Sequence, residues 1–187
     1  MAPILAALGL GVWAAVELGL RGRTPEARTM RAGADDAGTT RITAVAGLGC
    51  WLAPWLWRAV AGAGPLGRAG TLAAGVVLAL GLALRIWAMR TLGTAFTRTL
   101  VAGAGPLVER GPYQVLRHPG YAAALLVLPA HAALASGRLA AAAAVAAVLA
   151  TVYAHRIAAE EALLARHFGA AWQRYRQRTA RLLPGVY

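Results

Sequence analysis

The chain has 187 residues, of which 59% are hydrophobic and 14% are charged, and its formal net charge of +12 arises without a single lysine. So low a charged fraction excludes an ordinary soluble domain and indicates an integral membrane protein with one domain. The arginines stand at the ends of apolar segments and form no aromatic-interleaved basic stripe, which argues against a nucleic-acid partner.

Five apolar segments predict membrane-spanning helices, so we expect an all-α, polytopic helical bundle. The segments are Pro3–Leu20, Ile42–Val60, Thr71–Met89, Tyr121–Ala135 and Leu139–Ile157. At a rise of about 1.5 Å per residue, the first three match a hydrocarbon core of about 30 Å. The fourth is short and contains Pro129, which predicts a tilted, kinked or incompletely spanning helix. The first lacks a basic n-region and is expected to be a retained helix rather than a cleaved signal peptide.

The arginines predict the orientation of this bundle. One side receives most of them: Arg21, Arg23, Arg28, Arg31, Arg41, Arg85, Arg90, Arg98, Arg110, Arg117, Arg156, Arg166, Arg174, Arg176, Arg178 and Arg181. Only Arg58, Arg68 and Arg138 fall on the other side. The positive-inside rule therefore places the N-terminus outside and the C-terminus in the cytoplasm, and the membrane is expected to be a bacterial plasma membrane.

The segments outside the predicted spans are polar. The linker Arg21–Arg41 is rich in glycine and aspartate and is expected to be a loop. After the fifth span, two further helices are expected, Ala158–His167 and Ala171–Arg181. The arginines of the second one alternate with Trp172 and Tyr175, which predicts a cytoplasmic helix lying on an anionic membrane surface.

Isolated polar residues inside the spans give few signs of a metal or redox site. Cys50 is the only cysteine and is expected to be a buried thiol. The spacing of His118, His131 and His155 matches no metal-binding motif, so no metal or haem is expected. His131 is instead expected to form an intramembrane hydrogen bond, and Glu17 to pair with an arginine of a neighbouring helix.

Two polar segments flank the last two predicted spans at the same end of the bundle. Pro106–Arg110 leads into a Gly111-Pro112 turn, whose backbone suits either the edge of a planar base or a plain re-entrant connector. Next, Arg117–Tyr121 begins the fourth span, where a helix N-terminus with Arg117 and His118 favours an anion. Headgroup anchoring by Arg117 and Tyr121 is the alternative.

The second polar segment follows the fifth span. Arg156, Glu160 and His167 fall on one helical face, together with Leu163 or Leu164. The neighbours Glu160 and Glu161 are about 100° apart around the helix, so at most one of them points fully into a central pocket. Such a carboxylate suits an ammonium group or a pair of ribose hydroxyls, or else it forms a surface ion pair with Arg156.

Seven short motifs occur in an order that resembles the isoprenylcysteine carboxyl methyltransferase family and related membrane phospholipid and thiol methyltransferases. They are Leu84-Arg85-Ile86-Trp87-Ala88, Leu92-Gly93-x-x-Phe96, Pro106-Leu107-Val108-x-x-Gly111-Pro112-Tyr113, Arg117-His118-Pro119-x-Tyr121, Glu160-Glu161-x-Leu163, Phe168-Gly169-x-x-Trp172-x-x-Tyr175 and Leu183-Pro184. Together they cover a methyltransferase-like catalytic region, residues 84–184, which follows N-terminal spans in residues 1–83. Where the family often has a histidine just before the Leu-Val pair, this chain has Gly105-Pro106.

The resemblance implies an S-adenosylmethionine-dependent membrane methyltransferase that releases S-adenosylhomocysteine. The implied cofactor contacts are Leu107, Val108, Tyr113, His118, Pro119, Gly120, Tyr121 and Glu160. Arg156 is implied to face the nucleophilic group of the acceptor, and Arg156 with Glu160 forms the implied catalytic pair. No metal is implied.

The expected acceptor is a lipophilic small molecule or a lipid-modified molecule that partitions into the membrane. A carboxylate or hydroxyl of an isoprenoid-type molecule is favoured, while a thiol and a phospholipid amine stay open. The alternative is a non-enzymatic small membrane protein, such as a transporter subunit or an assembly factor. A transporter is expected to place ionisable residues near the middle of the bilayer, whereas most charges here gather at one rim.

Overall fold

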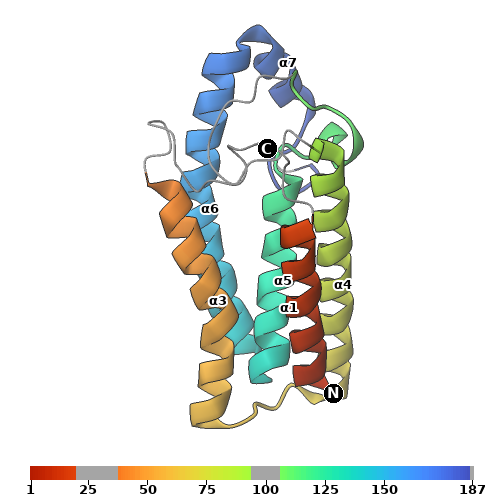
Figure 1. Cartoon of the computed structure of the whole chain (residues 1–187), viewed down its shortest axis with the longest axis vertical. Coiled ribbons are helices and arrows are strands. Elements are labelled where there is room, and N and C mark those ends of the chain that lie inside the picture. The colour runs from red at the N-terminus through yellow and green to blue at the C-terminus, as the bar shows by residue number, and fades with distance from the viewer. Residues whose placement is uncertain (20–37, 94–105, 186–187) are drawn as a thin grey trace.

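The computed structural model describes residues 1–19, 38–93 and 106–185, and these are almost entirely helical (Figure 1). In chain order the elements are α1 (Ala2–Gly19), α3 (Thr39–Ala61), α4 (Gly67–Leu92), the short 3-10 helix η3 (Gly111–Gln114), α5 (Pro119–Ser136), α6 (Leu139–Phe168) and α7 (Ala170–Arg178). The predicted all-α fold is confirmed. Most of the predicted Arg21–Arg41 loop lies outside the described residues, and its last residues already belong to α3.

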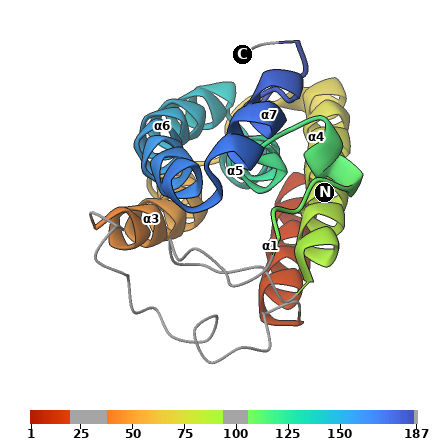
Figure 2. The ribbon, with the colours of Figure 1, turned by 90° about the horizontal axis from the view of Figure 1, so that it is seen from above.

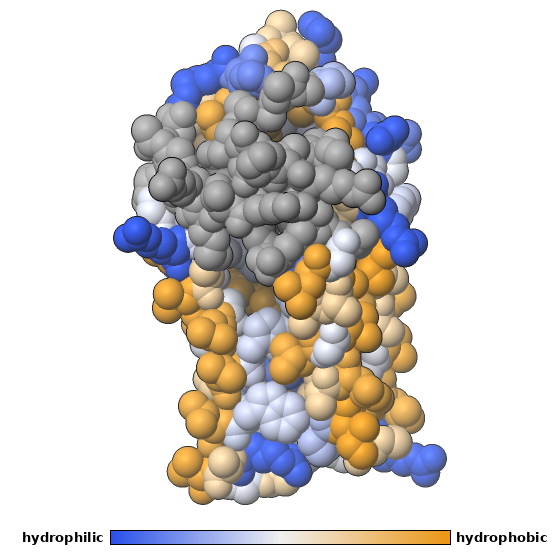
Figure 3. All heavy atoms as spheres, viewed as in Figure 1, coloured by the Kyte–Doolittle hydropathy of each residue, from blue (hydrophilic) through white to orange (hydrophobic). Residues whose placement is uncertain are grey.

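Five of the described helices, α1, α3, α4, α5 and α6, are long and apolar enough to cross a membrane. Their outer faces expose large apolar side chains that a soluble protein would bury, among them Ile4, Leu8, Ile42, Val45, Leu56, Leu72, Val76 and Leu80. Figure 3 shows this apolar surface in orange along the length of the bundle, with hydrophilic residues gathered toward its two ends. The protein is therefore an integral membrane protein, as the composition predicted.

Helix α5 is the centre of the bundle. Thirteen of its 18 residues are buried, against two of 18 in α1. The helices α1, α3, α4 and α6 all pack against it, as the view from above shows (Figure 2). Its many alanines allow this close approach, because small residues let helix backbones come together in a membrane. Its 18 residues reach about 27 Å, close to the thickness of a hydrocarbon core of about 30 Å.

Two glycines set the closest helix contacts of the bundle. A Cβ atom built on Gly81 of α4 would lie 2.7 Å from Val127 Cγ2 and 2.9 Å from Leu126 Cβ of α5. A Cβ on Gly9 of α1 would lie 2.6 Å from a methyl group of Leu78 in α4. Leu126 Cβ and the nearby backbone of Val127 cannot move aside easily, so the α4–α5 packing requires glycine at position 81. At Gly9 the nearest atoms belong to the end of the flexible Leu78 side chain, which can shift to admit a Cβ.

The chain crosses back and forth so that the polar segments meet at one end of the bundle. The C-terminal ends of α1, α4 and α6 lie there with the N-terminal ends of α3 and α5, and we call this the site end (Figure 1). At the opposite end, the amide of Gly64 donates a hydrogen bond of 3.0 Å to the carbonyl of Ser136, which joins the two turns.

Helix α6 extends past the bundle at the site end. It continues without a break from Leu139 to Phe168, so the predicted helical segment Ala158–His167 is confirmed as the continuation of the fifth span. No glycine or proline interrupts the helix between Leu139 and Phe168. At about 1.5 Å per residue, its 30 residues reach about 45 Å. The extra length carries Glu160 and Glu161 beyond the apolar part of the bundle.

Candidate functional site

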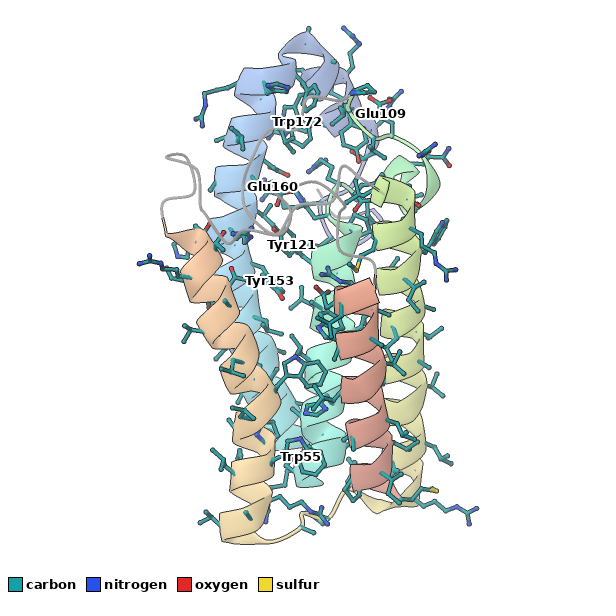
Figure 4. The ribbon with its side chains drawn as sticks, in the orientation of Figure 1. Trp55, Glu109, Tyr121, Tyr153, Glu160 and Trp172 are labelled. Carbon is teal, nitrogen blue, oxygen red and sulfur yellow. The ribbon has the colours of Figure 1, made fainter. Side chains whose placement is uncertain are left out.

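Tyr121, in the first turn of α5, lies at the centre of a polar cluster at the site end. Its hydroxyl donates a hydrogen bond of 2.7 Å to Glu160 Oε2 of α6 and accepts one of 2.9 Å from Arg156 Nε, one turn earlier in α6. The labelled side chains in Figure 4 show Tyr121 and Glu160 facing each other between these two helices. The predicted catalytic pair is therefore joined through one phenol oxygen.

Arg156 is buried, and its guanidinium group also reaches α3. Its Nη1 donates to the hydroxyls of Thr39, at 3.1 Å, and of Thr40, at 2.9 Å. A buried cation at the edge of a membrane is costly unless it is hydrogen-bonded, and these two threonines supply part of that compensation. Neither threonine was predicted as a site residue, because both lie in the segment expected to be a loop. Arg156 thus fixes the start of α3 against α5 and α6.

Glu161 lies next to Glu160 in α6 but belongs to a second cluster. Its Oε1 accepts hydrogen bonds from Arg117 Nε, at 3.1 Å, and from Arg181 Nε, at 3.2 Å, and lies 3.2 Å from His118 Nε2. Its Oε2 accepts another from Arg181 Nη2, at 2.7 Å. The Glu161 side chain is 11% exposed, whereas that of Glu160 is 29% exposed. Glu161 is therefore occupied by the protein itself, and Glu160 retains surface for a ligand.

The segment after α7, Thr179–Leu182, runs beside the segment before α5. Leu116 and Ala180 form a parallel β-bridge. The amide of Ala180 donates to the carbonyl of Val115 at 2.9 Å, and the amide of Arg117 donates to the carbonyl of Ala180 at 2.7 Å. This pairing ends α7 at Arg178, which corrects the prediction of a helix reaching Arg181. We call Thr179–Leu182 the tail strand.

Arg117 holds the tail strand from inside the protein. Its Nη1 donates to the carbonyl of Arg176, at 2.9 Å, and to the carbonyl of Thr179, while its Nε binds Glu161. The side chain is 3% exposed. The structure thus contradicts the alternative in which Arg117 anchors lipid headgroups.

Helix α7 packs onto the site end through its aromatic residues. Trp172 and Tyr175 are almost completely buried, and the arginines of α7 point outward. The Tyr175 hydroxyl donates a hydrogen bond of 2.8 Å to the carbonyl of Tyr113 in η3. These two aromatic residues therefore close the end of the bundle (Trp172 in Figure 4), and the outward arginines are the side chains left for the predicted contact with an anionic membrane surface.

Tyr113 and Tyr175, which this hydrogen bond joins, both have raised pKa values. Burial raises the pKa of Tyr113, and the charge of Glu160 raises it further. Burial likewise raises the pKa of Tyr175, while the positive charge of Arg117 opposes part of that increase. Both phenols therefore stay neutral at physiological pH.

The remaining predicted cofactor residues surround these clusters. His118 is buried as the N-cap of α5, and its Nδ1 lies 3.8 Å from Glu160 Oε1. Pro119 is buried at the first position of α5, and the carbonyl of Gly120 accepts a 3.2 Å hydrogen bond from Arg85 Nη1. The other two, Leu107 and Val108, are half-buried ahead of η3.

Arg85 of α4 forms the ion pair that the sequence predicted for Glu17. Its Nη2 lies 2.5 Å from Glu17 Oε1 of α1, and its guanidinium group lies 5.0 Å from the ring centroid of Trp13. Through the carbonyl of Gly120, the pair also touches the first turn of α5. Arg85 therefore connects α1, α4 and α5 directly below the Tyr121 cluster.

The residues at the site end fit the cofactor that the motifs imply. Glu160 is a partly exposed carboxylate that suits an ammonium group or ribose hydroxyls. Leu107 and Val108 offer an apolar edge, and the ring of Tyr113 is buried in η3, which follows them in the chain. The described residues thus combine an apolar surface with one convergent acidic group, as pockets for charged nucleoside-containing molecules do.

Comparison with known proteins gives one family. The profile of the isoprenylcysteine carboxyl methyltransferase (ICMT) family matches residues 73–166, half of the chain. The matched region runs from α4 to α6 and contains the Tyr121, Arg156 and Glu160 cluster, while α1, α3, α7 and the tail strand lie outside it. No curated protein matches the chain.

Proposed function

The chain belongs to the isoprenylcysteine carboxyl methyltransferase family of membrane methyltransferases, and from this premise we propose that it methylates a lipophilic, membrane-held acceptor with S-adenosylmethionine. The observation that carries the proposal is the hydrogen-bonded series Arg156–Tyr121–Glu160 at the site end, inside the family region. In this series the Arg156 guanidinium group lies on the side of the membrane-spanning helices, and the Glu160 carboxylate lies one turn further along α6, toward α7. A polar cofactor and an apolar acceptor thereby meet at one place.

Glu160 is proposed to hold a polar group of the cofactor. Its Oε2 is oriented by the Tyr121 hydroxyl, and its exposed surface accepts hydrogen bonds from a ligand. Leu107, Val108 and Tyr113 would form one wall, and His118, Pro119, Gly120 and Tyr121 the other. When bound, S-adenosylmethionine would supply an electrophilic methyl group, and S-adenosylhomocysteine would be released.

Arg156 is proposed to face the nucleophilic group of the acceptor. Thr39, Thr40 and Tyr121 fix its guanidinium group, so the cation is oriented before the acceptor binds. A fixed cation lowers the pKa of a nearby acid, which favours the anionic, nucleophilic form of a carboxylic acid or phenol. Positioning of two bound reactants supplies about 7–11 kcal/mol in favourable cases. We therefore favour a carboxylate or hydroxyl of an isoprenoid-type acceptor.

The rival proposal, a non-enzymatic transporter subunit or assembly factor, has less support. Family membership favours the enzyme. Among the described residues, the ionisable side chains of Arg117, Arg156, Glu160 and Glu161 gather at the site end rather than along a path through the bundle. The rival predicts that the protein binds neither S-adenosylmethionine nor S-adenosylhomocysteine.

Calorimetric titration of the purified protein with both ligands tests the cofactor role. The proposal expects saturable binding that weakens about tenfold or more in Glu160→Gln, since a hydrogen bond to a charged group contributes about 1.5–3 kcal/mol. His155→Gln, an exposed change on the same helix, is the matched control and keeps wild-type affinity. Unchanged affinity in Glu160→Gln would move the role to another residue.

Arg156→Ala tests the acceptor role separately. Its expected effect is a higher KM for the acceptor or a lower kcat, with cofactor affinity close to that of the wild type. Loss of cofactor binding in a folded Arg156→Ala protein contradicts this assignment, because Arg156 would then support the cofactor pocket instead.

A further inference from the structure

Several polar side chains far from the site end have partners within the protein. His131 Nε2 of α5 lies 3.3 Å from the carbonyl of Trp51, which confirms the predicted intramembrane hydrogen bond. Arg138 Nη2 donates a hydrogen bond of 3.0 Å to the carbonyl of the last residue of α3. Arg58 and Arg68 differ from these, because neither forms a hydrogen bond or an ion pair with a residue that the structure describes.

These two arginines line one pocket at the opposite end of the bundle, which is the lower end in Figure 1. Its volume is about 360 Å³, near the lower end of the range of about 300–1,000 Å³ that is typical of small-molecule sites. Its walls come from the starts of α1 and α4, the end of α3 and the turns at this end. Arg58 is half-buried in the last turn of α3, and Arg68 is exposed in the first turn of α4. Both therefore lie where the bundle meets a membrane surface.

Close contact between two turns fixes the walls of this pocket. Gly64, between α3 and α4, and Gly137, between α5 and α6, both line it. A Cβ atom built on Gly137 would lie 2.9 Å from the amide nitrogen and 2.9 Å from the carbonyl oxygen of Gly64. Backbone atoms packed this closely leave little room for rearrangement. The chain itself therefore sets the shape of the pocket before any ligand binds.

The pocket is positively charged and receives no counter-charge from the described residues. None of its described lining residues is an aspartate or a glutamate. The acidic residues that the structure describes all lie toward the site end: Glu17, Glu109, Glu160 and Glu161. Cations that share a pocket repel each other, and an anion between them removes that repulsion. Guanidinium groups bind phosphate oxygens through paired N–H donors, and basic pockets between membrane helices bind phosphate headgroups.

The surroundings of the pocket favour a lipid as the source of the phosphate. Ile4 of α1 and Leu72 of α4 directly follow the lining residues Pro3 and Thr71, and both side chains are exposed. An acyl chain can therefore pack beside the pocket. Because no described lining residue is acidic, nothing there binds the ammonium group of a zwitterionic headgroup. A phosphodiester with an uncharged headgroup fits better.

We infer that this pocket binds the phosphodiester group of an anionic phospholipid through Arg58 and Arg68, with the acyl chains along the exposed apolar side chains of α1 and α4. The inference is independent of the proposed methyl transfer, since the pocket lies at the other end of the bundle from Glu160. Both arginines also precede the family region, residues 73–166. In the predicted orientation, the bound lipid belongs to the outer leaflet.

Native mass spectrometry of the detergent-purified protein tests this site. The probes are phosphatidylglycerol and phosphatidylcholine with the same acyl chains, added together at equal concentrations. The wild-type protein is expected to retain one phosphatidylglycerol in preference to phosphatidylcholine. Arg58→Gln/Arg68→Gln is expected to lower this preference about tenfold or more, because charge-assisted hydrogen bonds to the phosphate are lost.

Arg41→Gln/Arg90→Gln is the matched control. It removes the same charge from exposed positions at the other ends of α3 and α4, and it is expected to keep the preference. An equal loss in both double variants overturns the inference, because the preference then reflects net charge alone. A wild-type protein without the preference also overturns it. The single exposed changes Arg68→Gln and Arg90→Gln repeat the comparison with less risk to the fold.

Thermal unfolding separates a lipid from a free anion. A ligand that binds only the folded protein raises its unfolding temperature. Phosphatidylglycerol is expected to raise the unfolding temperature of the wild type more than phosphatidylcholine or inorganic phosphate does, and this difference is expected to vanish in Arg58→Gln/Arg68→Gln. An equal rise with inorganic phosphate would assign the pocket to a free anion and overturn the lipid site.

Discussion

Glu160 and Glu161 show how strongly neighbouring residues of one helix differ in their surroundings. Glu161 faces Arg117, Arg181 and His118, so both of its oxygens are bound by the protein. Glu160 faces Tyr121 and keeps part of its surface exposed. The angle of about 100° between adjacent residues of a helix separates the two roles, one structural and one proposed for the ligand.

Glu161→Gln is expected to destabilise the protein more than Glu160→Gln. The change removes the charge that neutralises two arginines, and breaking a buried ion pair typically costs about 3–5 kcal/mol. Arg181 is partly exposed, so a loss of stability near the lower end of this range is expected. Thermal unfolding in detergent measures the difference, and hydrogen exchange of the tail strand is expected to increase in Glu161→Gln alone. Equal stability of the two variants would contradict the structural role of Glu161.

At the scale of single elements, α7 and the tail strand form a cap on the site end. The Tyr175 hydroxyl binds the carbonyl of Tyr113, and Ala180 pairs with the segment before α5. The cap thereby joins η3, α5 and α6. Its attachment depends on a neutral phenol, because a phenolate has no proton to donate.

The cap is expected to loosen at alkaline pH. Burial raises the pKa of Tyr175 in the folded protein above the ordinary value of about 10, so the unfolded chain loses its proton first. The stabilisation is therefore complete below about pH 10 and is lost as the pH rises above it. Unfolding temperatures measured between pH 8 and pH 11 are expected to fall less steeply for Tyr175→Phe. Parallel curves for the two proteins would show that Tyr175 is not responsible.

The contact between α4 and α5 gives a second prediction at this scale. Gly81→Ala introduces a Cβ atom into Val127 and Leu126, and overpacking of this kind costs about 1–3 kcal/mol. Gly75→Ala is the matched control in the same helix, since its Cβ would meet only Leu5 at an ordinary 3.6 Å. Unfolding temperatures are expected to fall for Gly81→Ala and to stay level or rise for Gly75→Ala. A tolerated Gly81→Ala would contradict the tight packing.

The elements also show what sequence alone predicts well. The spans follow from long apolar runs, and their alternation brings the start of α5 and the end of α6 to the same end, so the meeting of Tyr121 with Glu160 was predictable. The tail strand was not, because a single β-bridge at Ala180 leaves no periodic pattern. Nor was the contact of Trp51 with His131, because sequence does not give the register between helices.

At the scale of the whole molecule, the two ends of the bundle differ in charge. The site end carries Arg117, Arg156 and the exposed arginines of α7, and the opposite end carries Arg58, Arg68 and Arg138. The positive-inside rule predicts that the site end faces the cytoplasm. There it would meet a water-soluble cofactor.

Cysteine labelling tests this orientation. In a Cys50→Ala background, Gln173→Cys places a thiol on the exposed face of α7, and Ala63→Cys places one at the opposite end. A membrane-impermeant maleimide added to intact cells is expected to label the Ala63→Cys protein and to spare the Gln173→Cys protein until the cells are opened. The reverse pattern would contradict the predicted topology.

The most direct test of the account is methyl transfer itself. The protein in lipid vesicles is incubated with S-adenosylmethionine carrying a deuterated methyl group and with isoprenoid carboxylic acids and phenols, and the organic phase is analysed by mass spectrometry. The account predicts a labelled methyl ester or ether whose yield falls in Glu160→Gln, when S-adenosylmethionine is kept below saturation, and in Arg156→Ala. A folded protein that binds no S-adenosylmethionine and labels no lipophilic acceptor would contradict it.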